Sequence, residues 1–303
     1  MSERIQKRLA QLGLGSRREI ERWITAGRIV VNGETAILGQ SVGAEDKILV
    51  DGKSIDLSEE KTPSKHVLLY NKPEGEVCTR KDPQGRVTVF DKLPAVHNGR
   101  WISVGRLDVN TSGLLIFTTD GELANKLMHP SSQIDREYAV RVLGDVDEPM
   151  LKRLTNGVEL EDGPARFEEI VAPKPDEEDE RANRWYYVCL QEGLNREVRR
   201  LWESQEGIKV SRLKRVRYAN VFLEKNLRLG QWRYASQEEL DGLYELVEMQ
   251  APVLETEQED KSERKEKHTR HAKTESARPQ SRQRREQDQQ RRRRQTSNRN
   301  RSR

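Results

Sequence analysis

Residues 101–121 read WISVGRLDVNTSGLLIFTTDG, and they indicate two strands joined by a loop, because two apolar segments flank a stretch rich in glycine and polar residues. We expect strands at 101–104 and 114–118, joined by a loop that carries Asp108 between Gly105 and Gly113. Rigid sheets often display functional groups on such loops. An aspartate among asparagine, threonine, serine and glycine is also a common turn former. From these residues alone, Asp108 is either a turn residue or a catalytic carboxylate.

Outward from this stretch, strands and helices alternate irregularly as far as about residue 247. The apolar runs predict strands at 66–71, 101–104, 114–118, 137–143, 184–190 and 210–223. Helical spacing of apolar residues predicts helices at 121–129, 147–156, 196–205 and 236–248. Asp162-Gly163 is a hairpin signal, and Ser236 with Glu239 is a capping box. Because regular strand–helix alternation is absent, we expect an α+β fold with a mixed sheet and not a doubly wound sheet.

Residues 3–57 predict a separate small α+β module. Ile5, Leu9 and Leu12 recur at helical spacing, and Ser16 with Glu19 forms a capping box that begins a second helix. Tight turns at Asn32-Gly33 and Asp51-Gly52 then connect short strands. Two arginines, Arg17 and Arg18, fall in the first turn of the second helix, where exposed amides and guanidinium groups bind phosphate. A solvated charged helix start would have the same sequence pattern.

The charge of the chain is divided unevenly along its 303 residues. Only 33% of residues are hydrophobic and 35% are charged, with a formal net charge of +4. Residues 261–303 hold 17 Lys and Arg against 5 Asp and Glu, which leaves 38 basic and 46 acidic residues in 1–260. Nucleic acid is the expected partner of such a tail, because basic side chains displace counterions from phosphates. The alternative is a tail that is merely solvated.

These boundaries predict a module at 3–57, a linker at 58–65, a second domain at 66–250 and a disordered basic tail at 251–303. Cys78 and Cys189 lie far apart and flank no other thiol, so neither a zinc site nor a disulfide framework is expected. The amino-terminal basic residues precede no apolar stretch typical of a secretory signal. We expect a cytoplasmic, monomeric protein that has no membrane segment and needs no metal or organic cofactor.

Three motifs occur in an order known from one enzyme family. Tyr70–Gly75, Gly105–Leu115 and Glu192–Trp202 resemble the motifs of pseudouridine synthases of the ribosomal small-subunit synthase A type. Ahead of them, Ile5–Gly33 resembles the S4 RNA-binding module, which presents its second helix to structured RNA. The resemblance therefore implies an S4-like module followed by a catalytic domain that isomerises uridine in RNA to pseudouridine.

The resemblance also implies roles for three side chains. Asp108 is the expected catalytic carboxylate, acting either as a nucleophile towards the ribose or as a base that removes a sugar proton. Arg199 is expected to hold that carboxylate, since a guanidinium stays charged and can bind it bidentately. Tyr138 is expected to pack against the target base and to assist proton transfer. Without the resemblance, Arg199 would be an ordinary exposed arginine and Tyr138 a half-buried strand residue.

The expected substrate is 23S ribosomal RNA, which rests on similarity to one subgroup, since relatives acting on the small subunit share the motifs. A uridine within a stem must be flipped out to reach the carboxylate. Leu194 departs from the family, in which arginine is usual. The expected RNA-binding residues are Arg17, Arg18, Arg28, Arg106, Asn195 and Arg196. The rival interpretation is a non-catalytic S4-type RNA-binding or ribosome-assembly protein.

Overall fold

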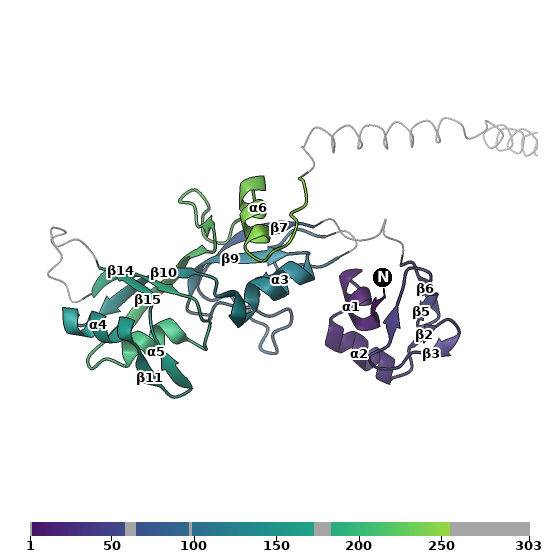
Figure 1. Cartoon of the computed structure of the whole chain (residues 1–303), viewed down its shortest axis with the longest axis horizontal. Helices are drawn as coiled ribbons and strands as arrows, with labels where there is room; N and C mark the ends of the chain where they lie inside the picture. Colours follow the sequence, from purple (N-terminus) through teal and green to yellow (C-terminus); the bar gives the residue numbers. More distant parts are fainter. Residues whose placement is uncertain (1, 58–64, 97–98, 173–182, 255–303) are drawn as a thin grey trace, which may run out of the picture. The chain divides into compact units, whose positions relative to one another are not determined.

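The computed structural model describes residues 2–57, 65–96, 99–172 and 183–254 (Figure 1). Their strands and helices form two groups, one within residues 3–55 and the other within residues 67–245. The predicted α+β class with a mixed sheet is confirmed. Most of the predicted linker and nearly all of the predicted tail lie outside the described residues.

The first group has two helices and a small sheet. Its elements are β1 (Glu3–Arg4), α1 (Ile5–Gln11), α2 (Arg17–Thr25), β2 (Ile29–Val31), β3 (Glu34–Thr35), β4 (Ser41–Val42), β5 (Ile48–Val50) and β6 (Lys53–Ile55). Four strands pair in the order β3-β2-β5-β6, and β1 pairs with β4. The Ser16 capping box is present at the start of α2. Asn32 and Gly33 both have positive φ, 53° and 92°, as a two-residue hairpin turn requires.

The second group is built on a nine-stranded sheet. Its strands are β7 (Val67–Lys72), β8 (Ile102–Val104), β9 (Ser112–Thr118), β10 (Arg136–Leu143), β13 (Glu169–Val171), β14 (Asn183–Leu190), β15 (Lys209–Tyr218), β16 (Val221–Phe222) and β17 (Trp232–Tyr234). The main order is β13-β14-β10-β15-β9-β7-β17, with β16 beside β15 and β8 beside β9. The pair β15 and β9 is parallel, whereas the other neighbouring strands are antiparallel.

The helices follow the predicted positions closely. They are α3 (Gly121–Met128), α4 (Glu148–Asn156), α5 (Glu197–Glu203) and α6 (Gln237–Glu245), and the predicted turn at 162–163 joins β11 (Val158–Leu160) to β12 (Gly163–Ala165). The single strand expected at 210–223 was wrong, because the chain turns at Ala219, whose φ is 54°, and divides it into β15 and β16. Strands β13 and β17 were not predicted, since three residues are too few to show a period. Every described helix is too short or too polar to cross a membrane.

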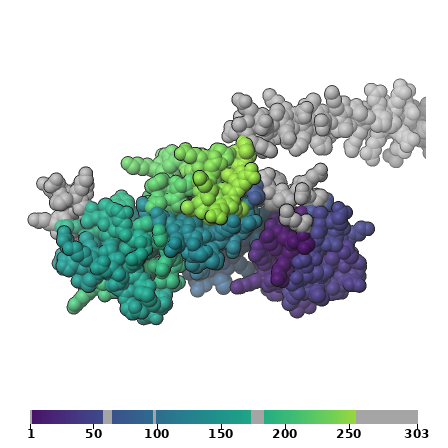
Figure 2. Space-filling view, in the orientation of Figure 1, coloured from purple at the N-terminus to yellow at the C-terminus, as the bar shows by residue number. Residues whose placement is uncertain are grey.

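The two halves of the large sheet meet at Gly113. A side chain there is excluded, because a Cβ would lie 2.2 Å from the carbonyl oxygen of Arg215 on β15, and φ of Gly113 is +104°. One apolar core, with α4 and α5 packed on β10, β14 and β15, includes Val140, Val188 and Trp202. A second apolar core lies around β7 and β9, and the half-buried Tyr138 contacts both cores. Figure 2 shows the teal and green residues of this group as a continuous body.

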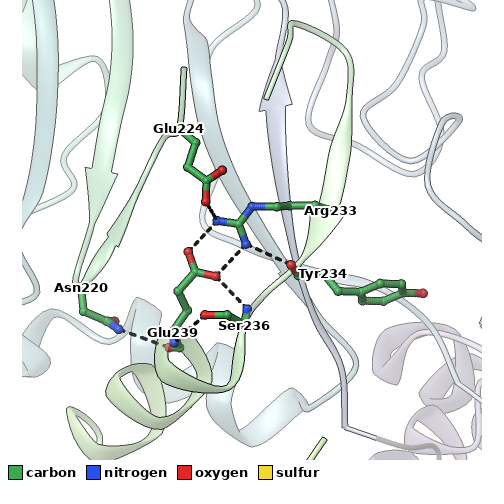
Figure 3. A network of polar contacts seen from close by, with 6 residues as sticks. All are labelled: Asn220, Glu224, Arg233, Tyr234, Ser236 and Glu239. Atoms are coloured by element: carbon green, nitrogen blue, oxygen red, sulfur yellow. Dashed lines mark hydrogen bonds and ion pairs between the residues drawn. The ribbon is translucent and has the colours of Figure 1, made fainter. Parts of the chain in front are cut away.

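Helix α6 is fixed to the sheet by Arg233 of β17 (Figure 3). Its two Nη atoms donate to the two carboxylate oxygens of Glu239 at 2.7 Å each, and Nη2 also donates to Glu224 at 2.5 Å. Glu239 at the same time accepts from the backbone of Ser236 at 2.8 Å, completing the predicted capping box. One carboxylate therefore caps the helix and joins it to the strand.

Candidate active site

A cleft of about 1210 Å³ opens beside the junction of β9 and β15. Its lining includes the loop Gly105–Val109 after β8, residues of the neighbouring strands β10 and β15, and Gly193–Val198 at the start of α5. Six of the lining side chains could take part in binding or catalysis near the β9–β15 junction: Asp108, Tyr138, Asn195, Arg196, Glu197 and Arg215. The sequence placed four of these six in the site, and missed Glu197 and Arg215.

The backbone of the Asp108 loop is held from several sides. Thr111 donates its amide hydrogen to the Asp108 carbonyl at 3.1 Å, and Gly75 donates to the Val109 carbonyl at 2.8 Å. Gly105, where the chain leaves β8, has a φ of 76° and so takes a conformation suited to glycine. The carboxylate of Asp108 therefore extends from a fixed loop with 36% of its side chain exposed.

Lys72 at the end of β7 is the main support beneath this loop. Its side chain is fully buried, and Nζ donates to the carbonyls of Pro73 and Asp108 at 3.0 Å and of Thr111 at 2.9 Å. Burial lowers the pKa of this ammonium, because a charge is costly to remove from water. The sequence placed Lys72 in a motif without a role, and its hydrogen bonds identify it as a positioning residue.

The cation beside Asp108 is Arg196, not the predicted Arg199. Arg196 Nη1 lies 3.7 Å from Asp108 Oδ2, and both side chains are partly exposed. Arg196 precedes α5 with a left-handed φ of 50°, which is uncommon for a residue with a side chain. The predicted helix began at this residue, whereas the observed helix begins at Glu197. The turn before the helix therefore brings a different arginine to the carboxylate.

Arg199 faces the interior instead. Only 7% of the residue is exposed, its Nη1 donates to the Val210 carbonyl and its Nη2 to the Asn110 carbonyl, each at 2.9 Å. Burial lowers its pKa, and Arg196 nearby adds to this effect. The expected ion pair with Asp108 is therefore replaced by a brace on the backbone two residues further along. Because one turn of helix separates Arg199 from Arg196, only the tertiary packing decides which of them faces the cleft.

Tyr138 and Arg215 are direct neighbours on paired strands. Strand β10 pairs with β15 so that Tyr138 lies opposite Arg215, and both line the cleft. Arg215 is 2% exposed, its Nε donates to the Leu114 carbonyl at 2.7 Å, and its Nη2 has no hydrogen-bond partner among the described residues. A buried guanidinium with a free donor beside a tyrosine suits a planar ligand with carbonyl oxygens. The sequence signal for Arg215 was only its period-two spacing from the core residue Leu213.

The wall of the cleft has an excess of buried positive charge. The guanidinium carbons of Arg136 and Arg215 lie 5.3 Å and 5.1 Å from the ring centroid of Tyr218. Arg136 donates to the carbonyls of Gln191 and Glu192 at 2.5 Å and 2.7 Å. Within the described part of the chain, neither arginine forms an ion pair with a carboxylate. This environment stabilises negative charge that develops on a bound molecule.

Glu197 is a buried carboxyl group in the lining of the cleft. It is 4% exposed and accepts a hydrogen bond from the Leu194 amide at 3.0 Å, while its other oxygen has no partner among the described residues. Burial raises its pKa to about 7, against the lowering effect of the Leu194 hydrogen bond. No cluster of three or more potential metal-ligating side chains occurs in the described segments.

The other predicted RNA-binding residues are distributed over both groups of elements. Arg106 and Asn195 line the cleft and are exposed. Arg17 and Arg18 are exposed at the start of α2. Arg28 donates to Asp51 through Nε at 2.8 Å and Nη2 at 2.5 Å, so a phosphate would have to compete with that carboxylate for it.

Comparison with known proteins identifies both groups. The sequence profile described as RNA pseudouridylate synthase matches residues 66–226, more than half of the chain, and the S4 domain profile matches residues 3–48. A solved structure described as a pseudouridylate synthase covers 79% of this chain and 99% of its own, with a TM-score of 0.55 and 24% identity, and thus supports the fold.

The sequence relatives are much closer. A protein of Pseudomonas aeruginosa named ribosomal large subunit pseudouridine synthase B is 54% identical over 93% of this chain and 72% of its own length. Proteins of the same name from Vibrio cholerae and Escherichia coli O157:H7 are 54% and 55% identical over 84% and 82% of this chain, and over 78% and 85% of their own. These names refer to the large subunit, whereas the motifs were compared above with the small-subunit type. The chain belongs to the RNA pseudouridylate synthase family, and its synthase domain follows an S4 domain.

Proposed function

We propose that this enzyme converts a specific uridine of large-subunit (23S) ribosomal RNA to pseudouridine, with Asp108 as the catalytic carboxylate. The observation that carries the catalytic role is the pair of Asp108 and Arg196, 3.7 Å apart in a cleft that Tyr138 also lines. The choice of RNA follows the names of the relatives from three bacteria. The family assignment disfavours the rival interpretation, in which the chain binds RNA without modifying it.

The reaction rearranges bonds within one nucleotide. The bond between C1′ and N1 breaks and its electron pair leaves with the uracil, while Asp108 either bonds to C1′ or takes a sugar proton. The uracil turns and C5 bonds to C1′, while the bond from C1′ to Asp108 breaks or, on the other route, Asp108 returns the sugar proton. The proton on C5 is finally lost while N1 gains one. Every atom of the product comes from the substrate or from water protons, so the balance needs no oxidant, reductant or group donor.

The side chains around Asp108 suit the negative charges of this reaction, first on the carboxylate and then on the departing uracil. Arg196 supplies a positive charge beside the carboxylate. When uracil leaves as an anion, the free Nη2 of Arg215 can donate to a uracil carbonyl oxygen, and Arg136 adds positive potential. Tyr138, opposite Arg215, stacks on the ring while it turns. Lys72 and Arg199 hold the backbone of the Asp108 loop, and their charges also interact with Asp108.

The RNA must present an extruded base to this cleft. Flipping a nucleotide costs a few kcal/mol, which contacts with the neighbouring phosphates offset. The exposed Arg106 and Asn195 at the cleft are placed for those contacts, and Arg17 and Arg18 at the start of α2 suit phosphates of a structured RNA. One chain supplies all these groups, so we propose a monomer, working in the cytoplasm where ribosomes are assembled.

The test is the substitution Asp108→Asn, which removes the charge and keeps the shape. We expect it to abolish pseudouridine formation in 23S ribosomal RNA while the affinity of the full-length protein for that RNA stays within about twofold. Site-resolved pseudouridine mapping in cells that carry each variant measures the first effect. The matched control Asp145→Asn lies at a position outside the cleft and should leave the map unchanged. An Asp108→Asn strain with a normal map would refute the catalytic assignment.

A further inference from the structure

Strands β10, β14 and β15 have one face that does not contribute to the core packed against α4 and α5. Neighbouring residues of a strand point to opposite faces of a sheet. Val140, Val188 and Leu213 belong to the core shared with α4 and α5, which lie on one side of these strands (Figure 1). The alternate residues therefore face the other side, away from that core.

Cross-strand pairing arranges these alternate residues in rows. Trp185 lies opposite Arg141, which lies opposite Arg212. In the next row, Tyr187 lies opposite Ala139, which lies opposite Lys214. Each row therefore has an aromatic side chain on β14 and a cation on β15. Ala139, between Tyr187 and Lys214, is small and buried, whereas Tyr187 is exposed and Lys214 is partly exposed. We call these rows, without Ala139, the open face.

The aromatic residues of the open face are accessible. Trp185 is 40% and Tyr187 is 51% exposed, and neither has an aromatic ring contact among the described residues. They are two positions apart on one strand, hence about 6.6 Å apart along it. Val171 on β13, opposite Tyr187, is also exposed at 49% and widens the apolar area.

The charge of the open face is positive. Arg141, Arg212 and Lys214 have no carboxylate partner within the described segments, and Nε of Arg141 is buried without a hydrogen-bond partner there. The adjacent carboxylate of Glu137 is already paired with Arg217 at 2.5 Å. The face therefore offers unpaired cations beside two accessible rings. None of its residues lines the cleft, so it is a separate surface.

We propose that the open face binds single-stranded RNA by stacking two successive bases on Trp185 and Tyr187 and by pairing their phosphates with Arg141, Arg212 and Lys214. Unpaired bases stack on aromatic side chains irrespective of sequence, and a basic groove follows their backbone. Duplex RNA has no free base faces to offer such rings. The open face thus holds a single-stranded segment of the same RNA whose target nucleotide enters the cleft, and in that respect the inference rests on the proposed function.

The experiment uses the full-length protein and a fluorescein-labelled 12-nucleotide oligoadenylate. This probe contains no uridine, so its binding does not depend on whether the cleft modifies RNA. We expect Trp185→Ala with Tyr187→Ala to weaken binding by at least about thirtyfold, because each of the two stacked bases contributes about 1–3 kcal/mol. Trp185→Phe with Tyr187→Phe should bind nearly as the unchanged protein does, because both rings remain.

The matched control is Phe222→Ala with Lys225→Ala, an exposed aromatic residue and an exposed lysine outside the open face. It should bind the oligoadenylate normally. In addition, an oligonucleotide carrying 4-thiouridine should cross-link under ultraviolet light to a peptide that contains residues 183–190. Affinity unchanged by the double alanine variant, an equal reduction in the control, or cross-links confined to other peptides would each overturn the proposal. An equal reduction in affinity for a 12-base-pair duplex would do so as well.

Discussion

Glu197 gives the most direct measure of the electrostatics of the cleft. Its pKa is raised to about 7 because the side chain is buried, with a smaller opposing effect of the Leu194 amide. In the unfolded chain a glutamate has a pKa of about 4.3. As the pH rises, the unfolded state therefore loses its proton first, and the free energy of unfolding falls between about pH 4.3 and pH 7 and is level above that.

The substitution Glu197→Gln removes this pH-dependent destabilisation. The difference between about 4.3 and about 7 corresponds to about 4 kcal/mol, since one pKa unit is about 1.4 kcal/mol. Some of it, about 1 kcal/mol, is already present at pH 5, where the unfolded glutamate is mostly ionised. The free energy of unfolding of the variant should therefore rise by about 3 kcal/mol relative to that of the unchanged protein between pH 5 and pH 8. Glutamine can still accept the hydrogen bond from Leu194, so this helix start should remain intact.

Urea unfolding of the two proteins at pH 5, 6, 7 and 8, followed by circular dichroism, measures the difference. Glu148→Gln on α4 is the control, because 85% of that side chain is exposed and its charge is solvated. The control should show no such trend with pH. If the difference between Glu197→Gln and the unchanged protein were the same at all four values, the carboxyl group would be ionised normally in the folded state, and the reasoning would be refuted.

Two further predictions concern the sheet junction and the tail. Gly113→Ala should lower the free energy of unfolding by about 2–6 kcal/mol, because of backbone strain at φ +104° and the clash with the Arg215 carbonyl. The control Gly85→Ala has open space around it and should lower the free energy of unfolding by about 1–3 kcal/mol, from backbone strain alone. Equal effects of the two substitutions in urea unfolding would contradict the close approach of Gly113 to Arg215. Deleting residues 261–303, with 17 basic side chains, should weaken RNA binding and lower the slope of log affinity against log salt by about 0.7 for each phosphate of single-stranded RNA that the tail neutralises. Identical slopes for the two proteins would show that the tail binds no phosphates.

Local signals in the sequence were sufficient for most elements. The capping boxes at Ser16 and Ser236 and the hairpin turn at Asn32-Gly33 involve residues close in the chain, so their geometry follows from local chemistry. The prediction of one strand over 210–223 was wrong because the apolar pattern continues through the turn at Ala219. A pattern of side chains cannot register a change of backbone direction that leaves the apolar spacing intact.

The loop around Asp108 was visible in the sequence, since its glycines, its polar residues and the flanking strands are contiguous. The partner of its carboxylate was not. Arg196 and Arg199 are three residues apart, and a left-handed residue before α5 decides that the first faces the cleft and the second braces Asn110. The contact of Lys72 with the Asp108 carbonyl and the pairing of Tyr138 with Arg215 likewise involve residues distant in sequence.

The sequence by itself thus determined the α+β class and the order of the two domains, and it predicted the central aspartate, because each depends on periodicity, turn chemistry or a contiguous motif. The tertiary structure decided which cations meet at the cleft and which residues of β10, β14 and β15 face away from it. The physical reason is that strand register and the start of a helix are set by packing across the sheet. A shift of one residue in the register of a strand would turn every one of its side chains to the opposite face.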